Sequence, residues 1–220
     1  MSLGLVGKKI GMTQVTNDRG DMIPVTVVEA GPCFITQIKS KESDGYEALQ
    51  VGYEKIKESK NNKPKQGHLK KASVSPIRVL KEFRMDGEKL DSYKLGQEIK
   101  ISDLFKEGQC VDIVGRTKGR GFTGVIKRHN MHGAPGGHGT HEFFRHAGSL
   151  GCRKPQHVVK GRRMPGRYGN ERVTVQNMEV VMVKSDENLL LIKGAIPGHN
   201  KSYLTINPAL KRKVAKKKVA

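Results

Sequence analysis

The stretch QCVDIVGRTKGRGFTGVIKR, residues 109–128, changes character in its middle. Its first seven residues are rich in β-branched and aliphatic side chains, which is typical of a β-strand. From Arg116 onward this pattern gives way to arginine, lysine and glycine without a regular apolar period. The stretch therefore predicts a strand of a folded core that leads directly into a segment of another kind.

The positive charge of the chain is concentrated after this boundary. The sequence has 41 Lys and Arg against 21 Asp and Glu, a net charge of +20. Residues 1–115 hold 19 basic and 16 acidic side chains, residues 116–172 hold 13 and 2, and residues 173–220 hold 9 and 3. Thirteen of the 26 glycines lie from Gly115 to Gly169. We therefore expect a globular domain of residues 1–115 and 173–208, a long loop of residues 116–172, and a basic tail of residues 209–220.

Such an excess of positive charge indicates a polyanionic partner, and nucleic acid is the commonest one, because each neutralised phosphate releases counterions. No apolar run approaches the roughly 20 residues that span a bilayer, and no long basic amphipathic helix is predicted. Three cysteines without a CxxC pair, Cys33, Cys110 and Cys152, favour neither a disulfide framework nor a thiolate zinc site. We expect an intracellular protein with no membrane partner.

The parts that flank the loop are predicted to be mainly β. Three β-branched runs precede it, at residues 21–30, 33–40 and 46–54. Asp44-Gly45 is a hairpin-turn signal between the last two runs. At the end of the loop and after it, residues 172–198 resemble successive strands joined by the turn KSDEN, residues 184–188. Short strands without βαβ alternation predict a small barrel or a sandwich.

Two regions of the globular part interrupt this β pattern. Ser102 and Gly108 are placed to begin and end a short helical turn before the strand at residues 109–115. Residues 57–98 begin as a polar, Lys-rich segment and continue into a candidate strand, PIRVLKEFRM, residues 76–85. We expect a small, partly helical α/β insertion over residues 57–98.

The loop of residues 116–172 lacks the pattern of a core. Its apolar residues are scattered without a period of 2 or 3.6, and glycine raises the entropy that is lost on ordering. We expect it to become ordered on RNA, where small residues let a backbone pass closely between phosphates. Arginine outnumbers lysine by nine to four in this loop, which favours bidentate contacts with phosphate.

The predicted RNA-binding side chains are the cations and histidines of the loop. They are Arg116, Lys118, Arg120, Lys127, Arg128, His129, His132, His138, His141, Arg145, His146, Arg153, Lys154, His157, Lys160, Arg162, Arg163 and Arg167. The glycines expected to permit close backbone approach are Gly119, Gly121, Gly124, Gly136, Gly137, Gly148 and Gly151. Phe143, Phe144 and Tyr168 could stack on bases or anchor the loop within the protein.

Four histidines in HNMHGAPGGHGTH, residues 129–141, have a spacing that could hold a metal ion. Zinc sites usually include cysteine or oriented carboxylates, whereas the nearest carboxylate here is Glu142 and the surrounding charge is positive. We expect no metal, and imidazoles that hydrogen-bond to phosphates and 2′-hydroxyls. The alternative is a zinc-binding enzyme or regulator built on this cluster.

Two further motifs resemble catalytic or cofactor sites but lack the required surroundings. Gly119, Gly121 and Gly124 fit GxGxxG, but Gly133 and Pro135 interrupt the helix that a dinucleotide fold needs. Near Cys152 no predicted fold places a base with an orienting partner. We expect no catalytic residue, no cofactor and no small-molecule substrate.

Nine residues between Phe105 and Arg128 form a recognisable pattern: Phe105, Asp112, Gly115, Thr117, Gly119, Arg120, Gly121, Gly124 and Arg128. Their spacing resembles the signature of the ribosomal protein L3 family of the large subunit, bacterial or organellar type. The blocks GLVGKKIGMTQ, GNERVTVQNMEVV and NLLLIKGAIPG, residues 4–14, 169–181 and 188–198, resemble the same family.

This resemblance implies a six-stranded β-barrel of the translation-protein type on the ribosome surface. The loop would run through large-subunit rRNA toward the peptidyl transferase centre, with its tip at Arg145–His157. The family binds rRNA early in assembly, near the three-prime end of the large rRNA, beside ribosomal proteins L14 and L19. A structural, non-enzymatic protein of a cytoplasmic or organellar ribosome is implied. Many members have a glutamine, in some cases methylated, where this chain has Cys152, so no such modification is expected.

Overall fold

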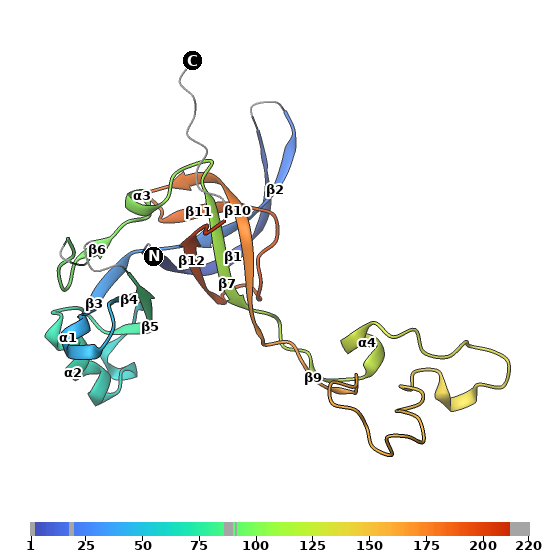
Figure 1. The fold of residues 1–220 in the computed structure, drawn as a ribbon. Helices are drawn as coiled ribbons and strands as arrows, with labels where there is room; N and C mark the ends of the chain where they lie inside the picture. The colour runs from blue at the N-terminus through green and yellow to red at the C-terminus, as the bar shows by residue number, and fades with distance from the viewer. Residues whose placement is uncertain (1–2, 18–19, 86–89, 91, 212–220) are drawn as a thin grey trace. The chain divides into compact units, whose positions relative to one another are not determined.

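The computed structural model describes residues 3–17, 20–85, 90 and 92–211, and within them six strands close into an antiparallel barrel (Figure 1). The order around the barrel is β1-β12-β7-β10-β11-β2. The bounds are β1 (Leu5–Thr16), β2 (Met22–Glu29), β7 (Cys110–Arg116), β10 (Arg172–Lys184), β11 (Leu189–Lys193) and β12 (Tyr203–Pro208). Closure gives every strand two neighbours, so the barrel has no unpaired edge.

The β-branched and aliphatic runs of the sequence form this barrel because alternate side chains can be buried in its interior. Val28, Ile113, Leu190 and Ile206 come from four different strands, and each is 0% exposed. The turn predicted at KSDEN is confirmed, since β10 ends at Lys184 and β11 begins at Leu189. The prediction of a mainly β chain is also confirmed.

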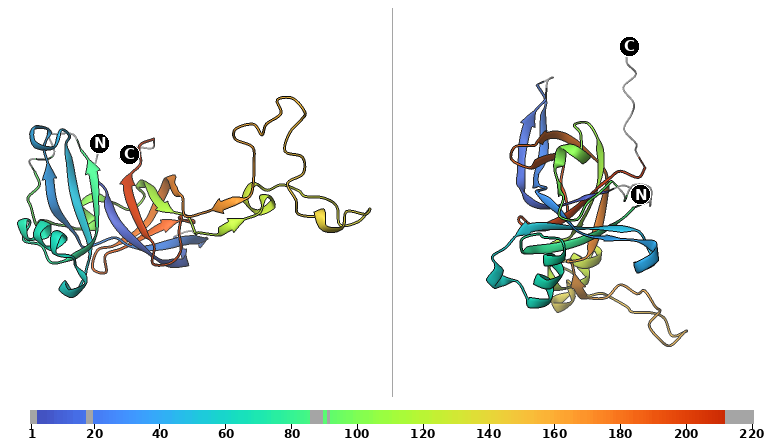
Figure 2. Two further views of the ribbon diagram at one scale, coloured as in Figure 1. Left: turned by 90° about the horizontal axis from the view of Figure 1, so that it is seen from below. Right: turned by 90° about the vertical axis from the view of Figure 1, so that its left-hand side faces the viewer.

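A second sheet is formed by the chain between β2 and β7, and its strand order is β5-β4-β3-β6 (Figures 1 and 2). Its strands are β3 (Cys33–Lys39), β4 (Ala48–Lys55), β5 (Ile77–Arg84) and β6 (Glu98–Ile99). A 3₁₀ turn, η1 (Glu58–Lys60), and the helix α2 (Lys63–Lys71) connect β4 to β5. The predicted strand at PIRVLKEFRM is thus β5, and the insertion is partly helical as predicted; residues 86–89 and 91 lie outside the described residues.

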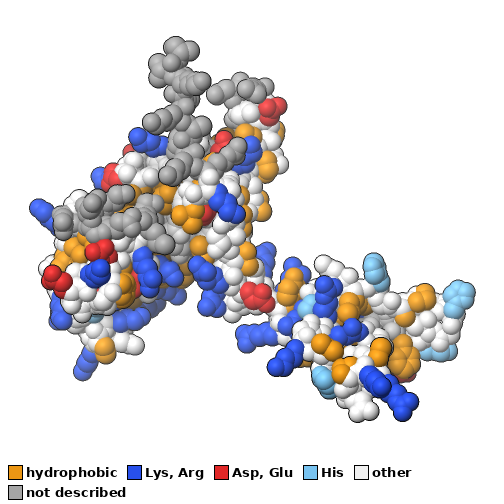
Figure 3. Space-filling view, viewed as in Figure 1, with side chains coloured by type: hydrophobic (Ala, Val, Ile, Leu, Met, Phe, Trp, Pro, Cys, Tyr) orange, Lys and Arg blue, Asp and Glu red, His pale blue; other side chains and the backbone are white. Residues whose placement is uncertain are grey.

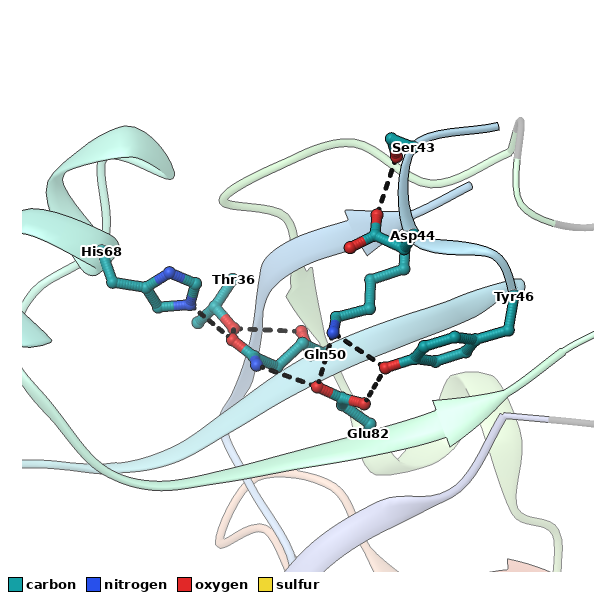
Figure 4. A network of polar contacts seen from close by, with 8 residues as sticks. Thr36, Ser43, Asp44, Tyr46, Gln50, His68 and Glu82 are labelled. Atoms are coloured by element: carbon teal, nitrogen blue, oxygen red, sulfur yellow. Dashed lines mark hydrogen bonds and ion pairs between the residues drawn. The ribbon is translucent and has the colours of Figure 1, made fainter. Parts of the chain in front are cut away.

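A polar network connects α2 with the second sheet (Figure 4). The ring Nε2 of His68 and the hydroxyl of Thr36 both lie within hydrogen-bond distance of the side-chain oxygen of Gln50, at 2.6 and 2.8 Å. The amide of Gln50 donates to Glu82, which also accepts from the hydroxyl of Tyr46 at 2.8 Å. These contacts fix α2 and β5 around β4.

Two local predictions need correction. β3 and β4 form the expected hairpin, but a one-turn helix, α1 (Lys41–Asp44), joins them. The Ser40 hydroxyl accepts from the N–H of Ser43 and starts this turn, and Gly45, with φ 79°, ends it.

The helical turn before β7 also differs from its prediction. It is α3 (Ile101–Leu104), with Lys100 at its N-cap and Phe105 at its C-cap. The carboxylate of Asp103 accepts from the N–H of Lys100, which starts the turn before Ser102. Gly108, with φ 73°, lies in the turn that follows and does not end the helix.

The chain divides into two compact units. The first, called here the barrel unit, contains the residues up to Arg116 and from Arg172 on, and the second, called the loop unit, is Thr117–Glu171. Arg116 and Arg172 are partners across β7 and β10, so the chain leaves and re-enters the barrel at one register position. The loop unit contains β8 (Gly121–Thr123), α4 (Val125–His129), the 3₁₀ turn η3 (His141–Phe143) and β9 (Gly166–Tyr168).

The beginning of the predicted tail is attached to the barrel unit. The N–H of Ala209 donates to the carbonyl of Cys110, and the N–H of Leu210 donates to Asp112. Residues 212–220, the rest of that tail, lie outside the described residues. In the described ranges, no helix has the length and apolar character needed to cross a membrane.

Candidate nucleic-acid interface

The stem of the loop unit is a two-stranded ribbon made by β8 and β9. Gly121 pairs with Tyr168 and Thr123 with Gly166, and the N–H of Arg120 donates to the carbonyl of Tyr168 at 2.9 Å. Gly169, with φ 78°, passes so close to the carbonyl of Lys118 that a Cβ there would lie 2.1 Å from its oxygen. Of the three glycines of GRGFTG, Gly121 lies in β8, Gly119 precedes this strand and Gly124 is the N-cap of α4. The antiparallel pairing of β8 with β9 was not expected from the sequence, and it differs from the parallel βαβ unit of a dinucleotide-binding fold.

The seven glycines expected to permit close approach have free space around them. A Cβ added at Gly124, Gly136, Gly137 or Gly151 would meet nothing within 4 Å, and at Gly119 it would make only an ordinary contact of 3.7 Å. Gly121 and Gly148 are also open, and their φ values of 66° and 72° require glycine for a second reason. The backbone at these positions is accessible to a ligand.

Two of the predicted RNA-binding residues, Arg128 and His129, share one partner inside the loop unit. The guanidinium of Arg128, at the end of α4, donates to the carbonyl of Met164 at 2.9 Å. The ring Nε2 of His129 lies 3.2 Å from the same oxygen. The guanidinium also packs closely on Gly166, where a Cβ would lie 2.4 Å from Nη1 of Arg128 and would displace this side chain. Arg128 and His129 are half-buried and hold the outgoing and returning limbs together.

The other sixteen predicted side chains are exposed. They are Arg116, Lys118, Arg120, Lys127, His132, His138, His141, Arg145, His146, Arg153, Lys154, His157, Lys160, Arg162, Arg163 and Arg167. Arg116 belongs to the barrel unit and the others to the loop unit. Arg162 donates to the carbonyl of Ser149, and the Nδ1 of His157 lies 2.9 Å from the carbonyl of Pro155.

The positive charge of the loop unit is not compensated within it. The unit has eleven Lys and Arg and only two carboxylates, Glu142 and Glu171. Every residue of Thr117–Glu171 is described, and no ion pair is formed among them. Figure 3 shows Lys, Arg and His side chains over the surface of this unit, at the lower right of the view. The surface therefore favours a polyanion.

Aromatic side chains lie among these cations. Phe122 is 78% exposed on β8, and it borders a pocket of about 400 Å³ that Arg167 and Tyr168 also line. The guanidinium of Arg120 lies 5.4 Å from the centre of the Tyr168 ring. Phe122 was not among the stacking residues expected from the sequence, although its place between glycines could have indicated an exposed ring.

Phe143 and Phe144 were the other two candidates for stacking. Phe143 is 64% exposed, and its ring contacts His146 edge-on at 5.0 Å between centroids. The carbonyl of Phe144 accepts from the N–H of Ala134, and Gly133 packs against the same carbonyl. Phe144 thus takes part in the internal structure of the loop through its backbone, whereas the ring of Phe143 is available to a ligand.

The histidine spacing does not assemble a metal site in the part of the chain that the structure describes, where no three His, Cys, Asp or Glu side chains are grouped to hold an ion. His129 is engaged with Met164, while His132, His138 and His141 are exposed. The H-x2-H-x5-H-x2-H pattern is therefore a sequence spacing without a corresponding cluster.

The cysteines show no arrangement for nucleophilic catalysis among the described residues. Cys152 is exposed and makes no hydrogen bond to a histidine. Cys33 is buried in the barrel unit, and burial raises the pKa of its thiol to about 12, so it stays protonated at neutral pH.

Comparison with known proteins identifies relatives over almost the whole chain. The family model described as ribosomal protein L3 matches residues 35–188. The chain is 51% identical to the large ribosomal subunit protein uL3 of Desulfitobacterium hafniense, over 97% of this chain and 99% of that protein. It is 53% identical to uL3 of Heliobacterium modesticaldum, over 96% and 98%. It is 50% identical to uL3 of Halalkalibacterium halodurans, over 97% and 100%.

Proposed function

Because the chain belongs to the ribosomal protein L3 family, we propose that it binds large-subunit rRNA directly and that the loop unit is its principal RNA-binding element. As a member of this family it is a structural protein of the large ribosomal subunit and not an enzyme. The observation that carries the proposal is the uncompensated charge of Thr117–Glu171, with eleven cations, two carboxylates and no internal ion pair.

Phosphate contacts supply most of the affinity in this proposal. The exposed arginines and lysines of the loop unit neutralise phosphates of adjacent RNA strands and release their counterions. The open glycines, such as Gly136 and Gly137, let the protein backbone approach the sugar-phosphate chain without steric conflict. The exposed histidines add hydrogen bonds to phosphates and 2′-hydroxyls.

The ribbon of β8 and β9 adds contacts that depend on the bases. Phe122 projects its ring into solvent beside Arg167 and Tyr168, and an unpaired base can stack on such a ring. Arg120, which covers the ring of Tyr168, can at the same time contact phosphate. The ribbon would therefore hold a single-stranded or bulged nucleotide.

The finer role of the protein follows from its family. We infer that it helps to initiate large-subunit assembly, and that the exposed residues Arg145–His157 form a tip that reaches toward the peptidyl transferase centre. Ribosomal proteins L14 and L19 are its proposed neighbours. The three relatives named above are bacterial, which supports a cytoplasmic ribosome over an organellar one. A zinc-binding enzyme or regulator is disfavoured, since the relatives of this chain are named as proteins of the large ribosomal subunit.

The proposal is tested by the salt dependence of binding to large-subunit rRNA. A fourfold variant, Arg153→Ala, Lys154→Ala, Lys160→Ala and Arg163→Ala, should lower the slope of log affinity against log salt by about 0.7–0.9 for each phosphate that is no longer neutralised. The matched control removes four exposed lysines of the barrel unit, Lys41, Lys94, Lys106 and Lys184, and should change the slope less. Equal slopes for the two variants would show that the loop unit is not the principal binding element.

A further inference from the structure

A second cationic pocket lies in the barrel unit, between the beginning of α2 and the beginning of β5. It has a volume of about 320 Å³, and its polar lining comes from Lys60, Asn61, Asn62, Lys65 and Arg78. None of these residues belongs to the loop unit. The pocket is therefore separate from the interface proposed above.

The backbone at this pocket presents free N–H donors. The first N–H groups of a helix have no partner within the helix. In α2 the N–H of Gln66 bonds to the carbonyl of Asn62 at 3.0 Å, and Pro64 has no N–H, so the N–H groups of Lys63 and Lys65 remain. The side chain of Asn62 stands at the N-cap but makes no capping hydrogen bond.

The charged side chains in the first turn of α2 have the sign opposite to that usually found at a helix N-terminus. Acidic side chains stabilise a helix N-terminus, since the helix dipole is positive there. The first turn of α2 has no acidic residue and instead carries Lys63 and Lys65. A bound anion would relieve this repulsion.

Asn61 supplies an independent observation. It is only 9% exposed, and its side-chain nitrogen is buried without a hydrogen-bond partner among the described residues. Its backbone is fully engaged, because its N–H donates to the carbonyl of Glu58 and its carbonyl accepts from the side chain of Gln66. A buried amide without a partner is unfavourable unless a ligand supplies an acceptor.

Two of the three cations that line the pocket are available to a ligand, and the third has a long ion pair. Lys60 and Lys65 are exposed and form no ion pair with the residues that the structure describes. Arg78 lies 3.8 Å from the carboxylate of Glu54, and Glu54 already accepts from Lys8 at 2.9 Å and from the hydroxyl of Tyr203. Glu58 is the one carboxylate in the sequence of residues 57–65, against four lysines.

We propose that this pocket binds a phosphate group, which accepts from the backbone at the start of α2 and from Asn61, and which is neutralised by Lys60, Lys65 and Arg78. Two sources supply this chemistry: a phosphodiester of an RNA strand, and free inorganic phosphate. The pocket gives the protein a second anchoring point whose use does not depend on the loop unit.

The first arm of the test titrates the full-length protein with inorganic phosphate and follows amide resonances by NMR. Saturable shifts are expected at the side-chain amide of Asn61 and at the backbone of Lys63 and Lys65. The double variant Lys60→Ala and Lys65→Ala should weaken this binding by about tenfold or more, as expected when hydrogen bonds to a charged group are removed. The control pair, Lys41→Ala and Lys106→Ala, removes the same charge from exposed positions and should bind phosphate normally.

The second arm measures the affinity of the same two double variants for large-subunit rRNA in a salt series. A lower slope for the Lys60/Lys65 variant than for the control pair assigns the pocket to an RNA phosphodiester. If the Lys60/Lys65 variant binds inorganic phosphate more weakly than the control pair but shows the same salt slope for rRNA, the ligand of the pocket is free phosphate. If neither arm separates the two variants, the proposal is wrong, and this result would leave the role of the loop unit untouched.

Asn61→Leu separates binding from a structural role. Because the amide nitrogen has no partner among the described residues, this replacement of similar shape should leave the melting temperature unchanged or raise it, while it weakens phosphate binding. A lower melting temperature with unchanged phosphate binding would contradict the assignment of Asn61 to the site.

Discussion

The barrel unit and the loop unit compensate their positive charges in different ways. In the barrel unit, Lys8 pairs with Glu54, Lys39 pairs with Glu82, and the buried Lys9 donates to the carbonyls of Ile196 and Gly198. In the loop unit, every residue of which is described, no lysine or arginine forms an ion pair. Part of the positive charge of the first unit is therefore compensated by carboxylates and carbonyls of the same unit, whereas no cation of the second unit is compensated by an ion pair.

The same contrast appears in packing. The barrel unit buries large side chains from all its strands, and Leu5, Ile113 and Leu190 are 0% exposed. In the loop unit the large apolar residues Phe122, Phe143 and Val159 are more than half exposed. Folding of the barrel unit is driven by apolar burial, and the loop unit has little of it. Substitutions in the two units should therefore affect different measurements.

The largest expected effect is on stability in the barrel unit. Ile113→Ala removes a fully buried side chain of β7 and should lower the free energy of unfolding by about 2–5 kcal/mol. Phe122→Ala, at a position that is 78% exposed, should change it by less than about 0.5 kcal/mol. Urea denaturation of both variants measures these values. Similar decreases would mean that the loop unit has a core of its own.

Asp112 tests the buried polar contacts of the barrel unit. It is 4% exposed, and its carboxylate accepts from the N–H groups of Asn177 and Leu210 at 2.9 and 3.3 Å. Asp112→Ala leaves both donors without an acceptor and should cost about 1–3 kcal/mol of unfolding free energy. The exposed Asp186 is the control, and Asp186→Ala should be close to neutral. Equal effects would argue against a structural role for Asp112.

Phe122→Ala should affect RNA binding although it spares stability. Removal of base stacking on this ring should weaken binding to large-subunit rRNA by about 1–3 kcal/mol. Met22→Ala, at an exposed apolar position of the barrel unit, serves as the control in the same filter-binding or fluorescence titration. An unchanged affinity for Phe122→Ala would remove the ribbon of β8 and β9 from the interface.

The smallest expected effect is a pH dependence in the second sheet. The hydrogen bond from Tyr46, and to a smaller degree the contact with Lys39, lowers the pKa of Glu82 below its ordinary value of 4.5. A carboxyl group whose pKa is lowered on folding stabilises the protein above its unfolded pKa, and this contribution disappears as the pH falls through the folded pKa.

Glu82→Gln tests that contribution. The side chain of Glu82 is 36% exposed, so the decrease in stability at pH 7 should be only about 0.5 kcal/mol, and it should vanish in strongly acidic solution. Denaturant unfolding at several pH values measures the difference from the parent chain. A difference that grows as the pH falls would contradict the assigned direction of the pKa shift.

Strands and segment boundaries can be predicted from the sequence where the apolar pattern or the charge is strong. The runs around Val28, Ile113 and Leu190 predict strands because their side chains must be buried, and the change at Arg116 predicts a segment of different composition. The strand pattern left a barrel and a sandwich as alternatives, and only the family resemblance implied six strands in a closed ring. Long-range pairing such as that of β1 with β12 leaves no local pattern in the sequence.

The local predictions that fail do so where side chains compete with the backbone. Ser40 and Asp103 start helical turns through their side-chain oxygens. The first contact adds a helical turn before Gly45, and the second begins α3 at Lys100 and not at Ser102. In the site, exposure of the cations could be predicted, but the internal role of Arg128 could not, since its partner Met164 is distant in sequence. The pocket at Asn61 likewise requires β5 to fold beside α2.

The most direct test of the difference between the two units is ultraviolet cross-linking of this protein to rRNA in assembled large subunits, with the cross-linked peptides identified by mass spectrometry. We predict that most cross-linked peptides come from residues 117–171, including those that contain Phe122 and Phe143, with a smaller set around Lys60 and Lys65. Cross-links confined to the barrel strands, with none in residues 117–171, would contradict the central claim that the loop unit is the principal rRNA-binding element.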